Sequence, residues 1–167
     1  MTGRAWRAAL AAAWLVCVPV GYAQGATGHR DFRSHADDIC ASTVRELKPL
    51  ERRLGEIYDA LKADEPSARA EYSTLAMSVI AIHRRADGRL SDVRPPRALA
   101  RRYRAMLATD RLRFGAQADR LAALYGQPSS PETDAEVERL TKLLDLRADR
   151  FLRLARRLRL SDCRKLD

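Results

Sequence analysis

Two cysteines, Cys40 and Cys163, have the side chains most suited to covalent chemistry in this chain. A cysteine pair in an exported protein is normally oxidised to a disulfide. That bond would close a loop of roughly 120 residues, for which the chain-entropy account gives about 4–5 kcal/mol of stabilisation. A third cysteine, Cys17, lies in an N-terminal apolar segment, so removal of that segment would leave only one possible pairing. The sequence therefore predicts a structural Cys40–Cys163 disulfide.

Arginines are the second group with an evident chemistry, because the chain has a formal net charge of +9. Basic residues at a helix end match the helix dipole and are each favourable by about 0.3–1 kcal/mol. The same rule makes arginines at the start of a predicted third helix unfavourable there, so those residues point to an anion-binding surface. Asp37, Asp38, Asp92 and Asp162 would offset part of this charge. The candidate surface comprises Arg97, Arg101, Arg102, Arg104, Arg153, Arg156 and Arg157.

Asp110 is the one acidic residue on an apolar helical seam, four residues after Met106 and four before Phe114. A buried carboxyl needs a partner. Arg111 and Arg113 are expected to point away from its face, so the partner would come from another helix. The first interpretation is a buried polar pair that fixes helix register. The alternative is a contact to a ligand inside a cavity of the bundle.

The remaining reactive side chains do not form a known catalytic or metal-binding pattern. His29 and His35 lie in or beside a polar segment without a rigid ligand spacing. His83 is expected to lie near a helix end, solvated or bonded to a carbonyl. No haem-attachment motif, paired Glu-x-x-His motif or nucleophile–histidine arrangement is present. We therefore expect no metal, no cofactor and no enzymatic activity.

The first 23 residues have the three parts of a signal peptide. Arg4 and Arg7 supply the positive charge, an apolar stretch of residues 8–20 follows, and cleavage is predicted after Ala23. The apolar stretch is short for a membrane anchor, which needs about 20 residues. Membrane anchoring and lipidation at Cys17 are the less favoured alternatives. The protein is thus expected to be exported to the periplasm or the extracellular space, without a transmembrane helix after cleavage.

The rest of the chain is expected to form one domain. Residues 24–35 are polar and predicted to be a disordered lead, and residues 36–167 are predicted to be a helical domain. Within it, apolar residues recur every three or four positions, as in amphipathic helices. This spacing predicts helices over residues 36–63, 67–87, 97–125 and 131–160.

Four residues define the expected boundaries and irregularities of these helices. Pro49 would kink or split the first helix, and a kink is favoured because the apolar seam keeps its register. Gly88 is a stop signal for the second helix. Ser130 is an N-cap for the fourth, with Pro131 at the first helical position.

Four helices with short connections favour an all-α, antiparallel up-down-up-down four-helix bundle. In that topology the start of the first helix lies beside the end of the fourth. Cys40 and Cys163 fall at these two places, so the helix order and the predicted disulfide agree with each other. The arginines named above would gather at the same end of the bundle.

The chain resembles a group of small exported bacterial helical-bundle proteins of unestablished function with one disulfide between the two ends of the domain. The resemblance rests on Ile39-Cys40, on Leu47 and Pro49-Leu50, on Pro95-Pro96 followed by Leu99 and Tyr103, and on the closing stretch Leu154, Ala155, Leu158, Leu160 and Cys163. Arg159 stands where a glycine would be expected, which predicts a more regular last turn. The resemblance implies a helical, disulfide-closed, exported protein and no particular substrate or site residue.

These observations favour a non-catalytic binding module whose basic end binds an anionic component of the cell envelope. That component would be a lipid headgroup, a polysaccharide or an acidic protein, because export makes nucleic acid an unsuitable physiological partner. The alternative is a structural or chaperone-like envelope protein that uses an apolar groove. A cofactor carrier or enzyme is the least favoured class.

Overall fold

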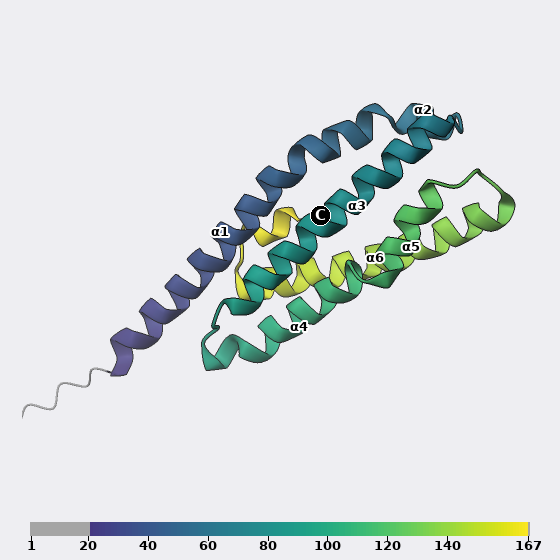
Figure 1. The fold of residues 1–167 in the computed structure, drawn as a ribbon. Coiled ribbons are helices and arrows are strands. Elements are labelled where there is room, and N and C mark those ends of the chain that lie inside the picture. Colours follow the sequence, from purple (N-terminus) through teal and green to yellow (C-terminus); the bar gives the residue numbers. More distant parts are fainter. Residues whose placement is uncertain (1–20, 167) are drawn as a thin grey trace, which may run out of the picture.

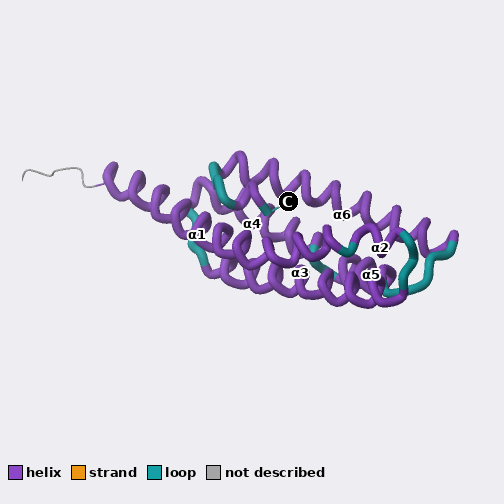
Figure 2. The backbone as a smooth tube through the Cα atoms, turned by 90° about the horizontal axis from the view of Figure 1, so that it is seen from above, coloured by secondary structure: helices purple, strands orange, loops and turns teal. Residues whose placement is uncertain are grey.

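The computed structural model describes residues 21–166, with side chains from Gly28 onwards. All regular secondary structure in this range is helical, which confirms the predicted all-α class (Figure 2). The predicted signal peptide, residues 1–23, lies outside the described residues except for its last three positions. The elements are α1 (Gly21–Glu56), α2 (Tyr58–Lys62), α3 (Pro66–Asp92), α4 (Arg97–Arg113), α5 (Ala116–Tyr125), α6 (Pro131–Leu158) and the 3₁₀ turn η1 (Cys163–Lys165).

The long helices reverse direction at each main turn (Figure 1). α1 and α3 lie side by side, with the short α2 at the turn between them. α4 leads back along the molecule, α5 continues in a similar direction, and α6 returns beside both. α3 packs mainly on α1 and α5, and α6 packs on α4 and α5, but α1 and α6 are not extensively packed on each other. α1 and α6 meet through side chains at the end that holds the disulfide, where residues of both helices share the main core.

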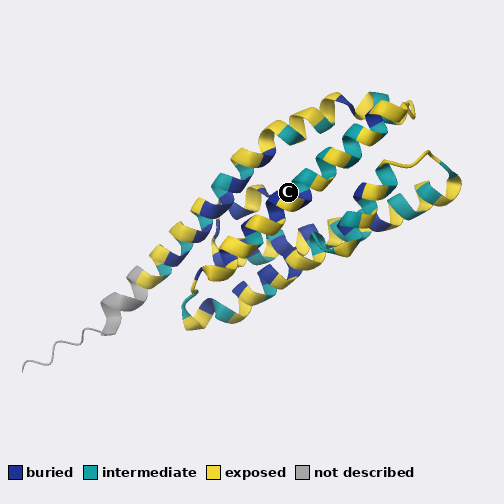
Figure 3. Cartoon of the chain, viewed as in Figure 1, coloured by how far each residue is buried: buried dark blue, intermediate teal, exposed yellow. Residues whose placement is uncertain are grey.

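Most of the apolar core lies at the end of the molecule that holds the disulfide (Figure 3). Tyr103 and Phe151 are the largest fully buried side chains of this cluster. The Tyr103 hydroxyl donates to the carbonyl oxygen of Leu90 at 2.7 Å, so its burial leaves no unpaired polar group. Each buried Leu or Phe contributes about 1.5–3 kcal/mol, so this end carries most of the hydrophobic stabilisation.

The core at the other end is much smaller. It consists of the buried residues Ile80, Ala118 and Ala122, with half-buried apolar neighbours that include Phe114 and Leu144. Two of the three buried residues are alanines, which fill little space between helices. The small side chains explain why a cavity persists in this half of the molecule.

The predicted disordered lead, residues 24–35, is wrong: these residues are part of α1. Phe32 is 3% exposed, and its ring meets Tyr103 edge-on with centroids 5.0 Å apart. Arg33 Nε donates to the carbonyl oxygen of Leu158 at 3.1 Å. Phe32 and Ala36 are buried on the same face of α1 as Cys40. Their tertiary contacts stabilise the helix in a segment whose polar composition suggested disorder.

Pro49 does not split the first helix, because α1 continues through it to Glu56. Pro49 is exposed, so the carbonyl oxygen that loses its helical donor faces solvent and the local cost is small. The interruption comes instead at Ile57, after which α2 begins. Ile57 is buried and turns the chain toward α3.

The prediction that α3 stops at Gly88 is also wrong, since the helix runs on to Asp92. Leu90, two residues before the end of α3, is 1% exposed and belongs to the main core. Its burial outweighs the modest helix-breaking tendency of one glycine, which costs about 1 kcal/mol. The helix ends where Pro95-Pro96 exclude further helical backbone.

The predicted helix 97–125 is interrupted, because α4 ends at Arg113 and α5 begins at Ala116. A Cβ atom on Gly115 would lie 2.9 Å from the backbone oxygen of Arg111, so the close turn requires glycine. Arg84 Nε donates to the Phe114 carbonyl oxygen at 2.7 Å, and Arg147 Nη1 donates to that of Leu112. Two arginines from other helices thus satisfy carbonyls that the interruption releases from helical bonding.

The N-terminus of α6 begins as the sequence predicts, but its C-terminus does not end as predicted. Ser130 is the N-cap, as the sequence predicts, since its Oγ accepts a hydrogen bond from the backbone N–H of Thr133 at 3.1 Å. At the other end Arg159 adopts φ 61°, a left-handed conformation that normally favours glycine. The backbone N–H of Leu160 donates to the oxygen of Ala155, which completes this helix stop. The predicted more regular last turn is therefore wrong.

Candidate functional site

The Cys40–Cys163 disulfide joins α1 to η1, with Cα atoms 4.9 Å apart. Both cysteines are fully buried in the main core. Beside them, the Asp37 carboxylate accepts hydrogen bonds from the backbone N–H groups of Ser161 and Asp162, at 3.0 and 2.9 Å. The covalent bond and this carboxylate together fix the end of the chain against α1.

The predicted anion-binding arginines lie on two helices that pack together, on the first turns of α4 and the last turns of α6. All seven are exposed. The α4 members stand at or near the positive end of the helix dipole, where the helix itself repels them. We call this set the cationic surface: Arg97, Arg101, Arg102, Arg104, Arg153, Arg156 and Arg157.

No member of the cationic surface forms an ion pair with another described residue. Of the acids expected to offset it, Asp37 holds the turn after α6, and Asp162 pairs with Lys165 at 2.6 Å. Asp38 and Asp92 are exposed and form no ion pair within the described chain. Within the described residues, the seven arginines of the cationic surface therefore have no ion-pair partner.

Many arginines outside the cationic surface form ion pairs with acidic side chains. The absence of ion pairs alone, however, does not distinguish the cationic surface. Arg30, Arg45 and Arg52 on α1 are also without an ion pair among the described residues. What sets the surface apart is the gathering of its members at one end, including four on the unfavourable part of α4. Ion pairs within the described chain involve, among others, Arg53, Arg69, Arg84, Arg85, Arg89, Arg111, Arg120 and Arg139.

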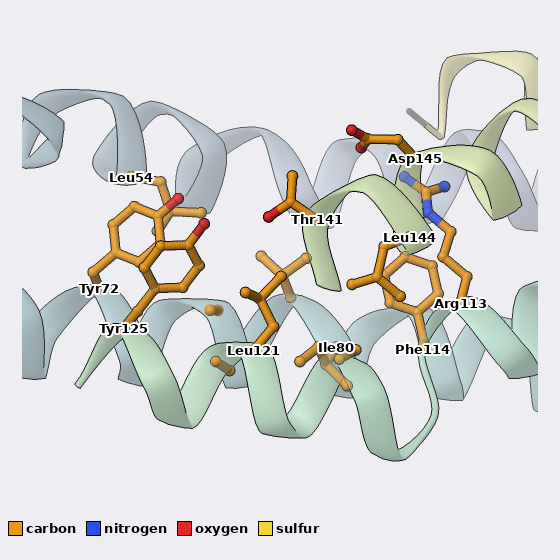
Figure 4. Close-up of a pocket in the computed structure, with 14 residues that line it drawn as sticks. Leu54, Tyr72, Ile80, Arg113, Phe114, Leu121, Tyr125, Thr141, Leu144 and Asp145 are labelled. Atoms are coloured by element: carbon orange, nitrogen blue, oxygen red, sulfur yellow. The ribbon is translucent and has the colours of Figure 1, made fainter. Parts of the chain in front are cut away.

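A cavity of about 260 Å³ lies in the less tightly packed half of the molecule (Figure 4). Its walls come mainly from α3, α5 and α6, with Leu54 contributed by α1. Tyr72 and Tyr125 lie close together at one end, with ring centroids 4.7 Å apart, and Phe114 lies at the other. Burial raises the pKa of Tyr72 to about 12, in keeping with its apolar surroundings. We call this cavity the apolar groove.

Asp110 is 5% exposed, and burial raises the pKa of its carboxyl to about 7, with Asp87 adding to the rise. Arg113, which was expected to point away from this face, is half-buried, and its charge opposes the rise in the pKa of Asp110. Arg113 Nη1 donates to the backbone oxygen of Leu166 at 2.9 Å. Arg113 thus acts on the Asp110 carboxyl through its charge.

His83 differs from the solvated or capping residue that was expected. It is 4% exposed and stacks on the Phe114 ring, with centroids 3.7 Å apart. Burial, helped by the charge of Arg113, lowers the pKa of His83 to about 3, so the imidazole is neutral at physiological pH. This stack lies at the interruption between α4 and α5, which the sequence interpretation did not anticipate. Gly115 was the only signal that could have revealed it.

The other histidines, His29 and His35, lie on α1. In the described part of the chain, no group of three or more His, Cys, Asp or Glu side chains is arranged to hold a metal ion. Among these same residues, no helix has both the length and the apolar character required to cross a membrane.

Comparison with known proteins places this chain in no family. No family model, no curated protein and no solved structure matches it. Functional inference therefore depends on the residues and geometry described above.

Proposed function

We propose that this chain is an exported, non-catalytic binding module whose cationic surface binds an anionic component of the cell envelope. The observation that carries the proposal is the concentration at one end of exposed arginines that form no ion pair with the described residues. Charges placed against the dipole of α4 cost stability, and binding of an anion would offset that cost. A lipid headgroup, a polysaccharide or an acidic protein would supply the negative charge.

The proposal includes export through a signal peptide over residues 1–23 and a periplasmic or extracellular location. The disulfide supports it, because disulfides persist in oxidising compartments. It also includes an up-down-up-down four-helix bundle in which α4 and α5 together form the third helix. The reversal of direction between α1, α3, α4–α5 and α6 supports this topology.

The second candidate is a structural or chaperone-like envelope protein that uses the apolar groove. The cavity of about 260 Å³ and its mainly apolar lining favour it. That volume exceeds the roughly 150 Å³ of an engineered cavity that accepts benzene, so a small apolar group would fit. Apolar contacts of this kind depend little on ionic strength.

Salt dependence separates the two candidates. The purified protein, with its disulfide formed, would be titrated with vesicles of phosphatidylglycerol and with a sulfated polysaccharide, using phosphatidylcholine vesicles as the neutral control. Binding through the cationic surface predicts affinity for at least one anionic probe that falls at least tenfold between 50 and 300 mM salt. Absence of binding to every anionic probe at 50 mM salt would reject the leading proposal. Binding that persists unchanged at high salt would favour the apolar groove.

A further inference from the structure

The outward side of α4 carries a stripe of exposed residues that continues the cationic surface toward the middle of the molecule. Residues three or four positions apart lie on one side of a helix. The exposed residues with this spacing are Arg97, Arg101, Arg104, Ala108 and Leu112. The buried residues of α4, among them Tyr103, lie on the other side. α4 contains one acid, Asp110, and it is buried, so the stripe itself carries no negative charge.

The last turns of α6 have a matching stripe. Its members, again three or four positions apart and all exposed, are Leu146, Arg150, Arg153 and Arg157. Arg150 is not part of the cationic surface as defined, but it likewise forms no ion pair with a described residue. Asp149 is the one acid between Leu146 and the end of α6. We call the two stripes together the α4–α6 face.

Each stripe ends on an exposed leucine, and the two leucines lie at the same level of the molecule. α4 and α6 pack closely and run antiparallel (Figure 1). Arg147, next to Leu146, donates a hydrogen bond to the backbone oxygen of Leu112. Leu112 is 56% exposed and Leu146 is 67% exposed, more than any other large apolar residue of the described chain. The α4–α6 face therefore combines arginines at the disulfide end with exposed apolar side chains farther along.

This combination favours a phospholipid bilayer over other anionic partners. A polysaccharide has no apolar layer that could bury the leucines. A second copy of the same face would bring arginines against arginines, which is unfavourable. A bilayer with anionic lipid offers phosphates, whose geometry the guanidinium group matches, and apolar chains directly beneath them. Both kinds of side chain on the α4–α6 face would thus find a partner.

We infer, on the basis of the proposed function, that the α4–α6 face lies flat on a membrane that contains anionic phospholipid. The arginines would contact headgroup phosphates, and Leu112 and Leu146 would enter the boundary between headgroups and acyl chains. From Arg97 to Leu112 the stripe on α4 is about 22 Å long, at 1.5 Å per residue. The axes of α4 and α6 would therefore lie parallel to the membrane plane.

The first test removes the leucines and keeps the arginines. In one double variant, Leu112→Gln and Leu146→Gln replace the leucines with a polar residue of similar length. The matched control, Tyr58→Gln with Met77→Gln, changes the other two exposed large apolar residues of the described chain. At 100 mM salt the leucine variant should bind phosphatidylglycerol vesicles roughly tenfold more weakly than the wild type. The control should remain within about twofold of the wild type.

A sulfated polysaccharide separates this inference from the proposed function. Any binding of that polymer should be the same within about twofold for the leucine variant and the wild type, because it depends on charge alone. Vesicle binding that is equal in the leucine variant and the wild type would overturn the inference and leave the cationic surface standing. Binding of the polysaccharide without binding of anionic vesicles would do the same. Failure of every anionic probe would reject the proposed function itself.

A tryptophan probe tests the orientation independently of affinity. Trp6 and Trp14 both lie in the predicted signal peptide, so the protein after cleavage contains no tryptophan. In Leu146→Trp, anionic vesicles should shift the fluorescence emission to shorter wavelength and protect the indole from acrylamide. In Met77→Trp, on α3, neither change should occur. A shift in both variants, or in neither when vesicles are bound, would contradict docking through the α4–α6 face.

Discussion

The His83 imidazole lies flat against the Phe114 ring, with ring centroids 3.7 Å apart and planes 11° apart. This stack joins α3 to Phe114, the residue directly after α4. The stack lies at the interruption between α4 and α5, where Arg84 and Arg147 donate hydrogen bonds to backbone carbonyls. The sequence pattern predicts one continuous helix at this place. Phe114 also lines the apolar groove, so the shape of that groove depends on the interruption.

Gly115→Ala tests the interruption directly. The new Cβ atom would lie 2.9 Å from the backbone oxygen of Arg111, so we expect destabilisation of about 1–3 kcal/mol. A continuous helix would give the opposite sign, because alanine in a helix interior is favoured over glycine by about 1 kcal/mol. The matched control is Gly88→Ala in α3, where no neighbouring atom lies within 4 Å of the added Cβ. Chemical denaturation should show that this control gains roughly 0.5–1 kcal/mol.

Phe32→Ala tests whether the segment before Ala36 is part of the fold. Loss of a buried ring that packs on Tyr103 should cost about 3–5 kcal/mol in denaturant unfolding. Asp31→Ala, at the exposed neighbouring position, should change stability by less than about 0.5 kcal/mol. If both variants unfold like the wild type, the segment is not packed as described.

Helix periodicity and capping residues carried the prediction of the helical class and of the start of α6 at Ser130. The disulfide partners followed from the expected export and from the two cysteines that remain after the N-terminal segment, and the helix order agreed with them. The predicted helix boundaries were wrong where contacts between residues distant in sequence determine where a helix begins or ends. Phe32 is held in a helix by Tyr103, which is distant in sequence, and Leu90 carries α3 beyond Gly88 because it is buried. The cavities could not be predicted at all, since they depend on which small side chains face each other across helices. For the candidate site, the arginines could be named from charge order, but the stack of His83 on Phe114 could not, because it depends on the interruption between α4 and α5.

The pH dependence of stability should reveal two opposing buried groups. Burial raises the pKa of Asp110 to about 7, so the folded state retains a proton that the unfolded chain loses near pH 4, and stability from this group falls as pH rises from about 4 to 7. Burial lowers the pKa of His83 to about 3, so the unfolded chain takes up a proton first, and stability falls as pH drops from about 6.5 toward 3.

Between about pH 4 and 6.5 these two effects should largely cancel in the wild type. Asp110→Asn would leave the effect of His83 alone, so the free energy of unfolding of this variant should rise with pH across that range. The expected slope is up to roughly 1.4 kcal/mol per pH unit for one proton. Identical pH profiles for the wild type and Asp110→Asn would rule out the assigned pKa of Asp110.

Reduction of the Cys40–Cys163 disulfide should lower the melting temperature. The bond constrains the unfolded chain over a sequence separation of 123 residues, and the expected loss is at most about 4–5 kcal/mol. Thermal melts of the oxidised protein, the reduced protein and a Cys40→Ser, Cys163→Ser double variant provide the measurement. The reduced protein and the double variant should agree with each other, and an unchanged melt on reduction would show that the bond does not form.

The central claim is that the position of the arginines, and not net charge alone, determines binding. Two triple variants remove the same charge. Arg97, Arg101 and Arg104 change to Gln in the first, and the ion-paired Arg53, Arg120 and Arg139 change to Gln in the second. The three control arginines are exposed, so their ion pairs contribute little to stability.

The most direct measurement is the ratio of the two variants' dissociation constants for the anionic probe that the wild type binds, at 100 mM salt. Each basic residue near an anionic surface contributes about 1 kcal/mol, so the first variant should bind roughly one hundredfold more weakly than the wild type. The second should remain within about threefold of the wild type. A first variant that binds as well as the second would contradict the account.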